Sequence, residues 1–179
     1  MNTESGDARD ADFVTTAKQS YSAAPLWARI AATSFGIGHL RPGPGTWASA
    51  ATILIWWLAA SWIPPLWRPG AALLLTAAVV AIGIPAATCV ARSSGVKDPP
   101  FVVIDEVAGQ LLTVVGVPVS WKSLLLSFIL FRVFDIFKPP PIRWLEGFRN
   151  GVGIVIDDIG AGLYALVTMH LLLHAGILR

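Results

Sequence analysis

Long stretches without a charged side chain limit what this chain can fold into. Four of them are residues 42–67, 69–91, 107–121 and 159–178. A helix needs about 20 apolar residues to cross the hydrocarbon core of a bilayer, where its backbone groups can bond only to one another. Charged residues make up 13% of the chain, against about 25% in soluble domains. The sequence therefore predicts an all-α, polytopic membrane helical bundle with about four to five transmembrane helices.

Glycine, proline and polar residues mark the expected ends of the helices. Prolines and glycines interrupt a polar loop over residues 92–106, and three consecutive prolines at 139–141 stop a helix. Helices are therefore expected at residues 46–63, 71–91, 106–119, 123–137 and 154–176. The short third helix could instead be re-entrant, which would change the number of crossings.

The first 24 residues differ from the rest of the chain. They mix both charge signs with small polar residues and lack the apolar core of a secretory signal. We expect residues 1–24 to be a disordered, solvated tail and residues 25–179 to form one integral membrane domain. The formal net charge of +2 is too small to favour a nucleic acid as partner, and the sequence indicates no particular oligomeric state.

Basic residues set the expected orientation of the helices, because cytoplasmic loops carry an excess of Lys and Arg. With five helices, one side of the membrane receives Arg29, Arg41, Arg92, Lys97, Lys138, Arg143 and Arg149. The other side receives Arg68, Lys122 and Arg179. We therefore expect the N-terminus in the cytoplasm and the C-terminus outside. The polar segments at 35–49, 95–110 and 132–158 then all lie at the cytoplasmic face.

Two similar acidic motifs stand beside apolar runs: Val-Ile-Asp-Glu-Val-Ala-Gly at 103–109 and Val-Ile-Asp-Asp-Ile-Gly-Ala-Gly at 155–162. Both are typical of helix N-termini, where acids interact favourably with the helix dipole and small residues allow close packing. Helix capping alone would explain one acidic pair. Two acidic pairs at the same face of the membrane repel each other unless a cation binds between them. The single cysteine excludes a cysteine-built metal site, and oxygen ligands suit Mg²⁺ or Mn²⁺. We expect a divalent-metal site formed by Asp105, Glu106, Asp157 and Asp158.

A second polar group lies at the end of the helix expected at 123–137. Arg132, Asp135 and Lys138 are spaced three residues apart and so lie on one helix face. A charged residue at membrane depth costs about 2.5–3.5 kcal/mol on insertion scales, and such residues usually mark function. One alternative is a structural Arg132–Asp135 ion pair with Lys138 extending to lipid headgroups. We favour an anion site at Arg132 and Lys138, with Asp135 as a further carboxylate on the metal side.

A glycine- and proline-rich loop precedes the first long helix, over residues 35–50. Thr46 is a suitable N-cap, with Ser49 three residues later, and backbone N–H groups at a helix start bind phosphate well. Such loops are common, so this signal is weak alone. We expect Thr46 and Ser49 to contact a phosphate, together with His39, although a lone loop histidine is often incidental.

Together these motifs resemble the phosphatidylglycerophosphatase A family of bacterial membrane phosphatases. The matching blocks are, in order, Phe35-Gly-Ile-Gly38 with Pro44-Gly-Thr46, Asp98-Pro99 with the acidic motif that continues to Gln110, residues 131–142, and residues 153–162. The resemblance covers about residues 28–175. Two departures, Ala48 for the usual glycine and Val155 for a frequent methionine, are small changes that weaken no expected ligand.

The resemblance implies a Mg²⁺-dependent lipid phosphomonoesterase in the bacterial inner membrane. It would convert phosphatidylglycerol phosphate, a phospholipid substrate in the membrane, to phosphatidylglycerol and phosphate at a site that faces the cytoplasm. The implied catalytic residues are Asp105, Glu106, Asp135, Asp157 and Asp158. The phosphate would be bound by Arg132, Lys138, Thr46, Ser49 and His39. Direct attack by water is slightly favoured over an aspartyl-phosphate, because the motifs of aspartate-, cysteine- and histidine-based phosphatases are absent.

Three other functions fit parts of the sequence. A CDP-alcohol phosphotransferase also uses membrane aspartates and metal, but its motif beginning Asp-Gly-x-x-Ala-Arg is absent. A divalent-cation transporter would place acids along a path at mid-membrane, whereas the acids here are expected at helix ends on one face. A purely structural subunit would not need Arg132, Asp135 and Lys138 on one helix.

Overall fold

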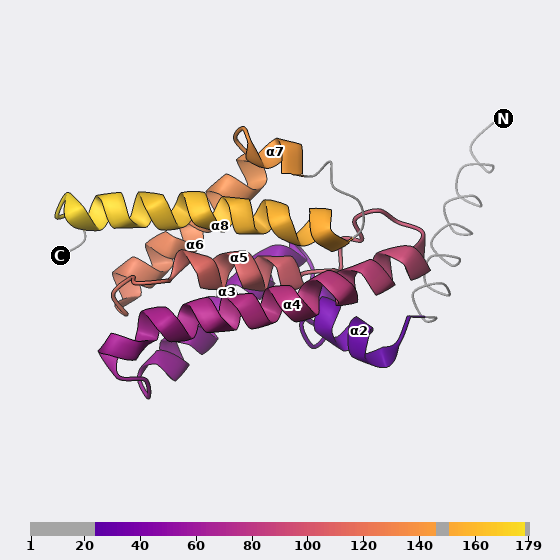
Figure 1. The fold of residues 1–179 in the computed structure, drawn as a ribbon, viewed down its shortest axis with the longest axis horizontal. Coiled ribbons are helices and arrows are strands. Elements are labelled where there is room, and N and C mark those ends of the chain that lie inside the picture. The colour runs from indigo at the N-terminus through magenta and orange to yellow at the C-terminus, as the bar shows by residue number, and fades with distance from the viewer. Residues whose placement is uncertain (1–23, 146–150, 178–179) are drawn as a thin grey trace.

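The chain folds into an elongated bundle of helices, shown in Figure 1. This computed structural model describes residues 24–145 and 151–177, and the remaining residues are drawn there as a thin grey trace. The tail predicted for residues 1–24 lies outside the described residues apart from Ala24, which is buried. Arg149 and Arg179, used above for the orientation, also lie outside them.

Seven α-helices and two short 3-10 turns are present in the described residues, which contain no strand. The prediction of an all-α fold is therefore confirmed. The helices are α2 Leu26–Ala32, α3 Pro44–Ala60, α4 Arg68–Ser94, α5 Ile104–Thr113, α6 Trp121–Phe137, α7 Ile142–Leu145 and α8 Gly151–His174. The 3-10 turns are Ile37–His39 and Pro65–Trp67.

Two helices are long and apolar enough to cross a membrane. They are the segment Pro65–Ser94, which contains α4, and α8. α4 has 27 residues and α8 has 24, which correspond to about 40 and 36 Å. α3 and α6 have 17 residues each, or about 26 Å. By length and composition, α4 and α8 are the candidate membrane helices in the described part of the chain.

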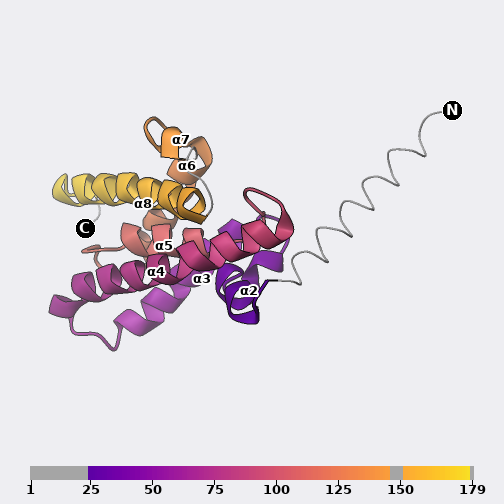
Figure 2. The same ribbon diagram turned by 45° about the vertical axis from the view of Figure 1, so that its right-hand side comes forward.

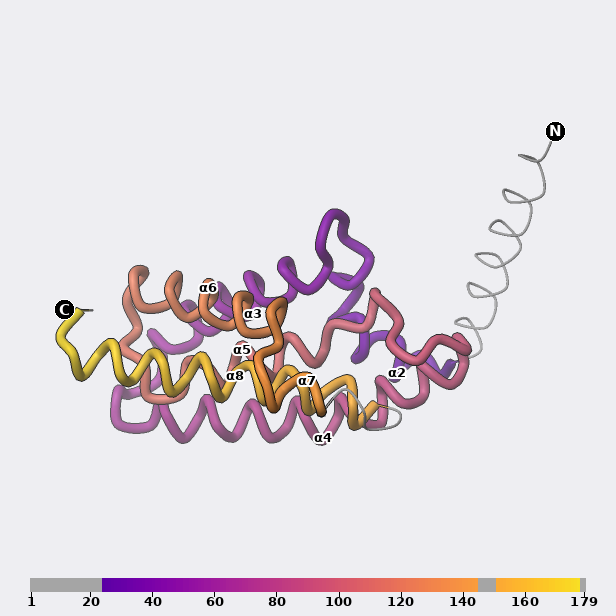
Figure 3. Tube along the Cα trace, turned by 90° about the horizontal axis from the view of Figure 1, so that it is seen from above, coloured from indigo at the N-terminus to yellow at the C-terminus, as the bar shows by residue number. Residues whose placement is uncertain are grey.

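α5 is the central helix of the bundle. It packs against α3, α4, α6 and α8, which run along it in Figures 1 and 3. Its ten residues correspond to about 15 Å, too short for the roughly 30 Å of a hydrocarbon core. The helix predicted at 106–119 is therefore wrong in extent. It ends at Thr113, and Gly116 follows with a φ of 72°, a left-handed conformation incompatible with a continuing helix.

α5 and α8 contact each other through two glycines. A Cβ on Gly162 would lie 2.5 Å from the carbonyl oxygen of Gly109, and a Cβ on Gly109 would overlap the ring of Phe131. The Thr113 hydroxyl lies 3.0 Å from the Gly109 oxygen and 3.4 Å from the Gly162 oxygen. The small residues after each acidic pair thus allow close helix approach, as expected. This contact fixes the position of α8 along α5.

The start of α3 differs from the prediction. α3 begins at Pro44, because Gly43 precedes it with a left-handed φ of 64° and proline suits the first helical position. Thr46 is therefore the third residue of the helix and not its N-cap.

Two other helix ends also differ from the prediction. α4 continues to Ser94, so Arg92 is helical instead of lying in the predicted loop. α8 already includes Gly151, so Asp157 and Asp158 lie about two turns into the helix. The expectation that these two aspartates stand at a helix start is therefore wrong.

α2 is a two-turn helix that the sequence did not predict. It lies beside the C-terminal part of α4 at one end of the bundle, as Figures 1 and 2 show. Ala28 and Ala32, one turn apart, are buried in a cluster with alanines and Val90 of α4. The backbone N–H of Val103 donates a 2.8 Å hydrogen bond to the Ala32 carbonyl. The alanine spacing is short and stands among glycines and prolines, so it gave no clear helical pattern.

Candidate active site

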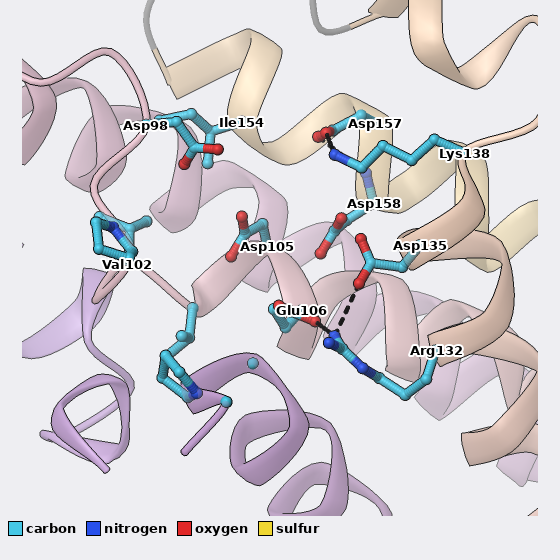
Figure 4. Close-up of a pocket in the computed structure, with 15 residues that line it drawn as sticks. Asp98, Val102, Asp105, Glu106, Arg132, Asp135, Lys138, Ile154, Asp157 and Asp158 are labelled. Atoms are coloured by element: carbon cyan, nitrogen blue, oxygen red, sulfur yellow. Dashed lines mark hydrogen bonds and ion pairs between the residues drawn. The ribbon is translucent and has the colours of Figure 1, made fainter. Parts of the chain in front are cut away.

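The acidic side chains of residues 24–145 and 151–177 all line one pocket, with a volume of about 260 Å³. They are Asp98, Asp105, Glu106, Asp135, Asp157 and Asp158. Arg132, Lys138 and the start of α3 at residues 43–45 also line it, as Figure 4 shows for the labelled side chains. When ionised, six carboxylates and two cationic side chains leave an excess of negative charge. The pocket therefore has the electrostatics of a cation site.

Three helices bring these residues together from distant parts of the sequence. α5 begins at the pocket, with Asp105 and Glu106 in its first turn. α6 ends there, so its last turns carry Arg132 and Asp135. α8 contributes Asp157 and Asp158, which both line the pocket. The two acidic motifs therefore meet in space, as the sequence predicted.

Glu106, Asp135 and Asp158 form the tightest carboxylate group. One oxygen atom from each lies within 4.8 Å of the others, a spacing that one cation can bridge. The ligand set expected from the sequence was Asp105, Glu106, Asp157 and Asp158. The structure brings Glu106 and Asp158 of that set together and adds Asp135. Asp105 and Asp157 line the same pocket outside this group.

Two basic side chains pair with these carboxylates. Arg132 Nη1 contacts the Glu106 carboxylate and lies 2.8 Å from Asp135 Oδ2. Lys138 Nζ lies 2.6 Å from Asp157 Oδ2. The Arg132–Asp135 ion pair considered from the sequence is thus present, with Glu106 as a second partner. Lys138 points toward Asp157 in Figure 4, which differs from the alternative in which it extends to lipid headgroups.

Two carboxylate oxygens in the pocket are buried without a hydrogen-bond partner in the described residues: Asp105 Oδ1 and Asp158 Oδ2. An unpaired buried polar atom is costly, so such atoms indicate a missing ion or water. Carboxylate oxygens are also the ligands that Mg²⁺ and Mn²⁺ prefer. The residues present therefore fit a divalent cation.

The surroundings of α5 change the acidity of its two carboxyl groups. α5 lies outside the candidate membrane helices. Burial, followed by the charge of Asp135, raises the pKa of Glu106 to about 7, although Arg132 partly offsets this. Burial, followed by the charge of Glu106, raises the pKa of Asp105 well above its usual value. A bound cation would favour the ionised form of both groups.

Three residues predicted to bind phosphate do not line the pocket. Thr46 is exposed in the first turn of α3, and His39 stacks on Phe101 with ring centroids 5.9 Å apart. Ser49 is buried behind the carboxylates, with its hydroxyl 3.4 Å from Glu106 Oε2. In this region the pocket is lined by Gly43, Pro44 and Gly45.

Gly45 and Asp98 are pocket residues that the sequence motifs did not identify as site residues. A Cβ on Gly45 would overlap the Glu106 carboxylate, so a glycine here leaves room for that side chain. Asp98 is an exposed lining residue, and its charge contributes to the raised pKa of Asp105. Both residues stand in blocks that carry the family resemblance, Pro44-Gly-Thr46 and Asp98-Pro99. Their place in these blocks is the sequence signal that could have identified them as pocket residues.

Comparison with known proteins finds relatives along most of the chain. The family model for phosphatidylglycerophosphatase A matches residues 30–173. Phosphatidylglycerophosphatase A of Haemophilus influenzae is 36% identical over 142 residues, 78% of this chain and 85% of the relative. The Escherichia coli K12 protein of the same name is 32% identical over 147 residues, 81% of this chain and 83% of the relative.

A third relative carries a different name. A Bacteroides thetaiotaomicron protein named as a candidate phosphatidylinositol-3-phosphatase is 37% identical over 142 residues, 75% of this chain and 86% of the relative. No solved structure matches the chain. The family match spans α3 to α8 and every acidic residue of the pocket, and it confirms the assignment made from the motifs. The chain belongs to the phosphatidylglycerophosphatase A family, a family of phosphatase enzymes.

Proposed function

We propose that this protein hydrolyses the phosphate monoester of phosphatidylglycerol phosphate and releases phosphatidylglycerol and inorganic phosphate. Family membership supports this, because relatives 36% and 32% identical are named phosphatidylglycerophosphatase A. The observation that carries the proposal is the gathering of the acidic side chains with Arg132 and Lys138 in one pocket. Such a pocket offers a cation site and an anion site side by side.

Glu106, Asp135 and Asp158 are the residues proposed to hold a divalent cation, Mg²⁺ or Mn²⁺. Their spacing within 4.8 Å supports this, as does the unpartnered oxygen of Asp158. Asp105 and Asp157 are proposed as further carboxylates of the same centre. When bound, such a cation neutralises charge on the phosphoryl group and polarises its oxygens.

Arg132 and Lys138 are proposed to bind the phosphate of the substrate. A guanidinium has five N–H donors, so Arg132 can retain its carboxylate partners and still donate to phosphate oxygens. The 2.6 Å contact with Asp157 orients Lys138. Thr46, Ser49 and His39 stay predictions for this role, and the contact of Ser49 with Glu106 supports a role in orienting that carboxylate.

Water is the proposed nucleophile. Its oxygen bonds to phosphorus while the bond from phosphorus to the glycerol oxygen breaks, and the glycerol oxygen takes up a proton. Asp105 is proposed to accept the proton of the attacking water, because its Oδ1 is buried without a partner and its raised pKa favours proton uptake. The products are the alcohol phosphatidylglycerol and inorganic phosphate.

We also propose that residues 25–179 form one multi-pass domain in the bacterial inner membrane, with four to five crossings and the pocket facing the cytoplasm. α4 and α8 support this by their length and composition. α3 adds a surface of exposed apolar residues, including Leu54, Ile55 and Leu58. The pocket lies where α5 begins and α6 ends, which is consistent with chemistry in the headgroup layer.

A phosphorylated inositol lipid is the second candidate substrate. The observation that favours it is the Bacteroides thetaiotaomicron relative, which is as similar as the other two. Both candidates share a phosphate monoester on the headgroup of a glycerophospholipid. The family match favours neither the cation transporter nor the CDP-alcohol phosphotransferase considered from the sequence.

The test is phosphate release by the purified protein in detergent micelles. Phosphatidylglycerol phosphate and phosphatidylinositol 3-phosphate are supplied in parallel with Mg²⁺, with Mn²⁺ and with EDTA. We expect release from the first lipid that EDTA abolishes. Asp158→Asn and Glu106→Gln should lower the rate by at least about 10²-fold, the usual loss when an electrostatic group of a site is removed.

Asp12→Asn is the matched control, because it neutralises an acid of the predicted tail and should retain the full rate. The absence of phosphate release with any divalent cation would contradict the proposed activity. Release from the inositol lipid alone would transfer the proposal to the second substrate. Full activity of both pocket variants would show that the carboxylate assignment is wrong.

A further inference from the structure

The Phe35-Gly-Ile-Gly38 motif is not part of the pocket. Phe35 is 90% exposed, and three consecutive residues there have positive φ: Ser34 at 47°, Phe35 at 59° and Gly36 at 94°. The left-handed conformation costs about 1–2 kcal/mol for each residue with a Cβ. A strained backbone conformation of this kind persists only where the surrounding structure holds it in place, and it often marks a functional position.

Hydrogen bonds hold this turn in place. The backbone N–H of Phe35 donates to the Ile30 carbonyl at 2.8 Å, and that of Gly38 donates to the Thr33 carbonyl at 3.0 Å. The Thr33 hydroxyl accepts from the N–H of Gly36 at 3.1 Å. The Phe35 ring is therefore presented outward by an ordered, bonded turn.

α2, which leads into this turn, has two unlike faces. The alanines Ala28 and Ala32 are buried against α4, and their small size allows α2 to lie close to that helix. The opposite face exposes Leu26 by 66%, Trp27 by 52% and Ile30 by 39%. Seven residues span about 10 Å, far too short to cross a bilayer. α2 can therefore lie along a membrane surface but not pass through it.

The chemistry of this surface fits an anionic lipid layer. Leu26, Ile30 and Phe35 line a hollow of about 380 Å³ together with Arg29. Apolar and aromatic side chains combined with a cation are typical of helices that lie in the boundary between headgroups and acyl chains. α4, the helix against which α2 packs, is a candidate membrane helix and exposes apolar side chains such as Leu75 and Ile82.

This surface is also joined to the pocket. The Ala32 carbonyl accepts the hydrogen bond from Val103, and Val103 lines the pocket two residues before Asp105. A Cβ on Gly38 would overlap the Phe101 carbonyl, so the turn packs directly on the loop that leads into α5. The depth of α2 in a membrane therefore sets the depth of the pocket.

We propose that Leu26, Trp27, Ile30 and Phe35 form an interfacial anchor that inserts into the headgroup boundary of an anionic bilayer and holds the pocket at the level of lipid phosphates. The role of the Phe-Gly-Ile-Gly motif is then lipid docking and not phosphate binding. Insertion itself does not depend on the reaction. Only the kinetic consequence rests on the proposed phosphatase function.

The first test measures insertion directly. Cys89→Ser removes the single native cysteine, and Phe35→Cys then carries an environment-sensitive fluorophore on the full chain in vesicles of phosphatidylethanolamine and phosphatidylglycerol. We expect a blue-shifted emission that lipids brominated on their acyl chains quench and aqueous iodide does not. Lys97→Cys, at an exposed position of the loop before α5, is the control and should show the opposite pattern.

Equal iodide quenching at positions 35 and 97, without quenching by brominated lipid, would overturn the proposal. Protection of the fluorophore at position 35 from iodide that appears only at a high protein-to-lipid ratio would also overturn the proposal. The surface would then contact a second copy of the chain. If an added soluble protein protected this fluorophore from iodide in the absence of lipid, the surface would be a protein-binding site, and the lipid anchor would be excluded.

The second test separates lipid docking from a structural role. Phe35→Asn keeps a residue that tolerates positive φ and removes the apolar ring, so the fold should be at least as stable. We expect KM for phosphatidylglycerol phosphate in vesicles to rise about tenfold, with kcat unchanged. KM for a water-soluble short-chain analogue should stay constant. An equal KM for wild type and variant in vesicles would contradict the anchor, whereas wild-type protein without activity would contradict only the proposed reaction.

Discussion

At the scale of single residues, Arg132 is one of the two cationic side chains that the protein itself places in the acidic pocket. It contacts Glu106 and Asp135, which are two of the three carboxylates proposed to hold a metal. The same half-buried guanidinium stabilises these carboxylates in the metal-free protein and is the group proposed to donate to a phosphate. Substitution by lysine would keep the charge but lose the fork geometry that serves both partners.

Glu106 should make the stability of the metal-free protein depend on pH. Its pKa is raised from 4.5 to about 7 in the folded state, so between these values the folded state binds more protons than the unfolded state. Stability must then fall as pH rises through this window. We expect the unfolding temperature in EDTA to be higher at pH 5 than at pH 8, measured by scanning fluorimetry in detergent.

Glu106→Gln is the control for this pH effect, because it cannot ionise and should lose the Glu106 part of the difference. Added Mg²⁺ should reduce the difference in the wild type, since a bound cation favours the ionised carboxylate. An identical pH dependence in wild type and Glu106→Gln would show that Glu106 does not titrate in this window.

At the scale of helices, the contact between α5 and α8 determines the geometry of the site. Gly162→Ala would bring a Cβ to 2.5 Å from the backbone oxygen of Gly109, and backbone cannot move aside as a flexible side chain can. We expect a loss of about 1–3 kcal/mol in stability and a loss of phosphate release, because separation of the helices moves Asp158 away from Glu106. Thermal unfolding and the phosphate assay measure the two effects.

Gly70→Ala is the matched control for this substitution. Gly70 lies in the first turn of α4 with nothing within 4 Å of an added Cβ, so stability should be unchanged or slightly higher. If Gly162→Ala behaved like Gly70→Ala, the glycine contact would not set the spacing of the two helices.

The sequence predicted the type of the helices better than their ends. Uncharged runs indicate α3, α4 and α8 because a membrane segment must bond its own backbone. The start of α3 was misplaced because Gly43 takes a left-handed conformation that allows Pro44 to open the helix, and no periodicity signals this. α2 was not predicted, because its two buried alanines give too weak a hydrophobic periodicity to indicate a helix.

The residues of the pocket were also largely predictable, but their grouping was not. Charged residues beside apolar segments indicate function, and this signal, together with their spacing in motifs, named seven of the eight charged residues in the pocket lining. The grouping of Asp135 with Glu106 and Asp158 depends on how far α6 extends along α5. That position follows from tertiary contacts, such as Phe131 against Gly109, which local sequence does not encode.

At the scale of the whole molecule, the expected orientation can be tested on both sides of α6. Lys122 lies in the first turn of α6 and Arg143 lies beyond its other end, and both are exposed. If α6 crosses the membrane, these two residues lie on opposite sides of it. In the Cys89→Ser background, a membrane-impermeant maleimide should label Lys122→Cys in intact spheroplasts and Arg143→Cys only after lysis. Labelling of both positions from the same side would show that α6 does not cross the membrane.

The distribution of the pocket over α5, α6 and α8 has a consequence for how the protein is made. Asp158 is synthesised about 50 residues after Glu106, which takes several seconds at typical rates of 5–20 residues per second. Arg132 emerges between them and can meet Glu106 before α8 has joined the bundle. A partly made chain in the membrane therefore has a neutralised glutamate but no complete carboxylate group. The proposed hydrolysis of a lipid phosphate therefore requires α8 to be in place.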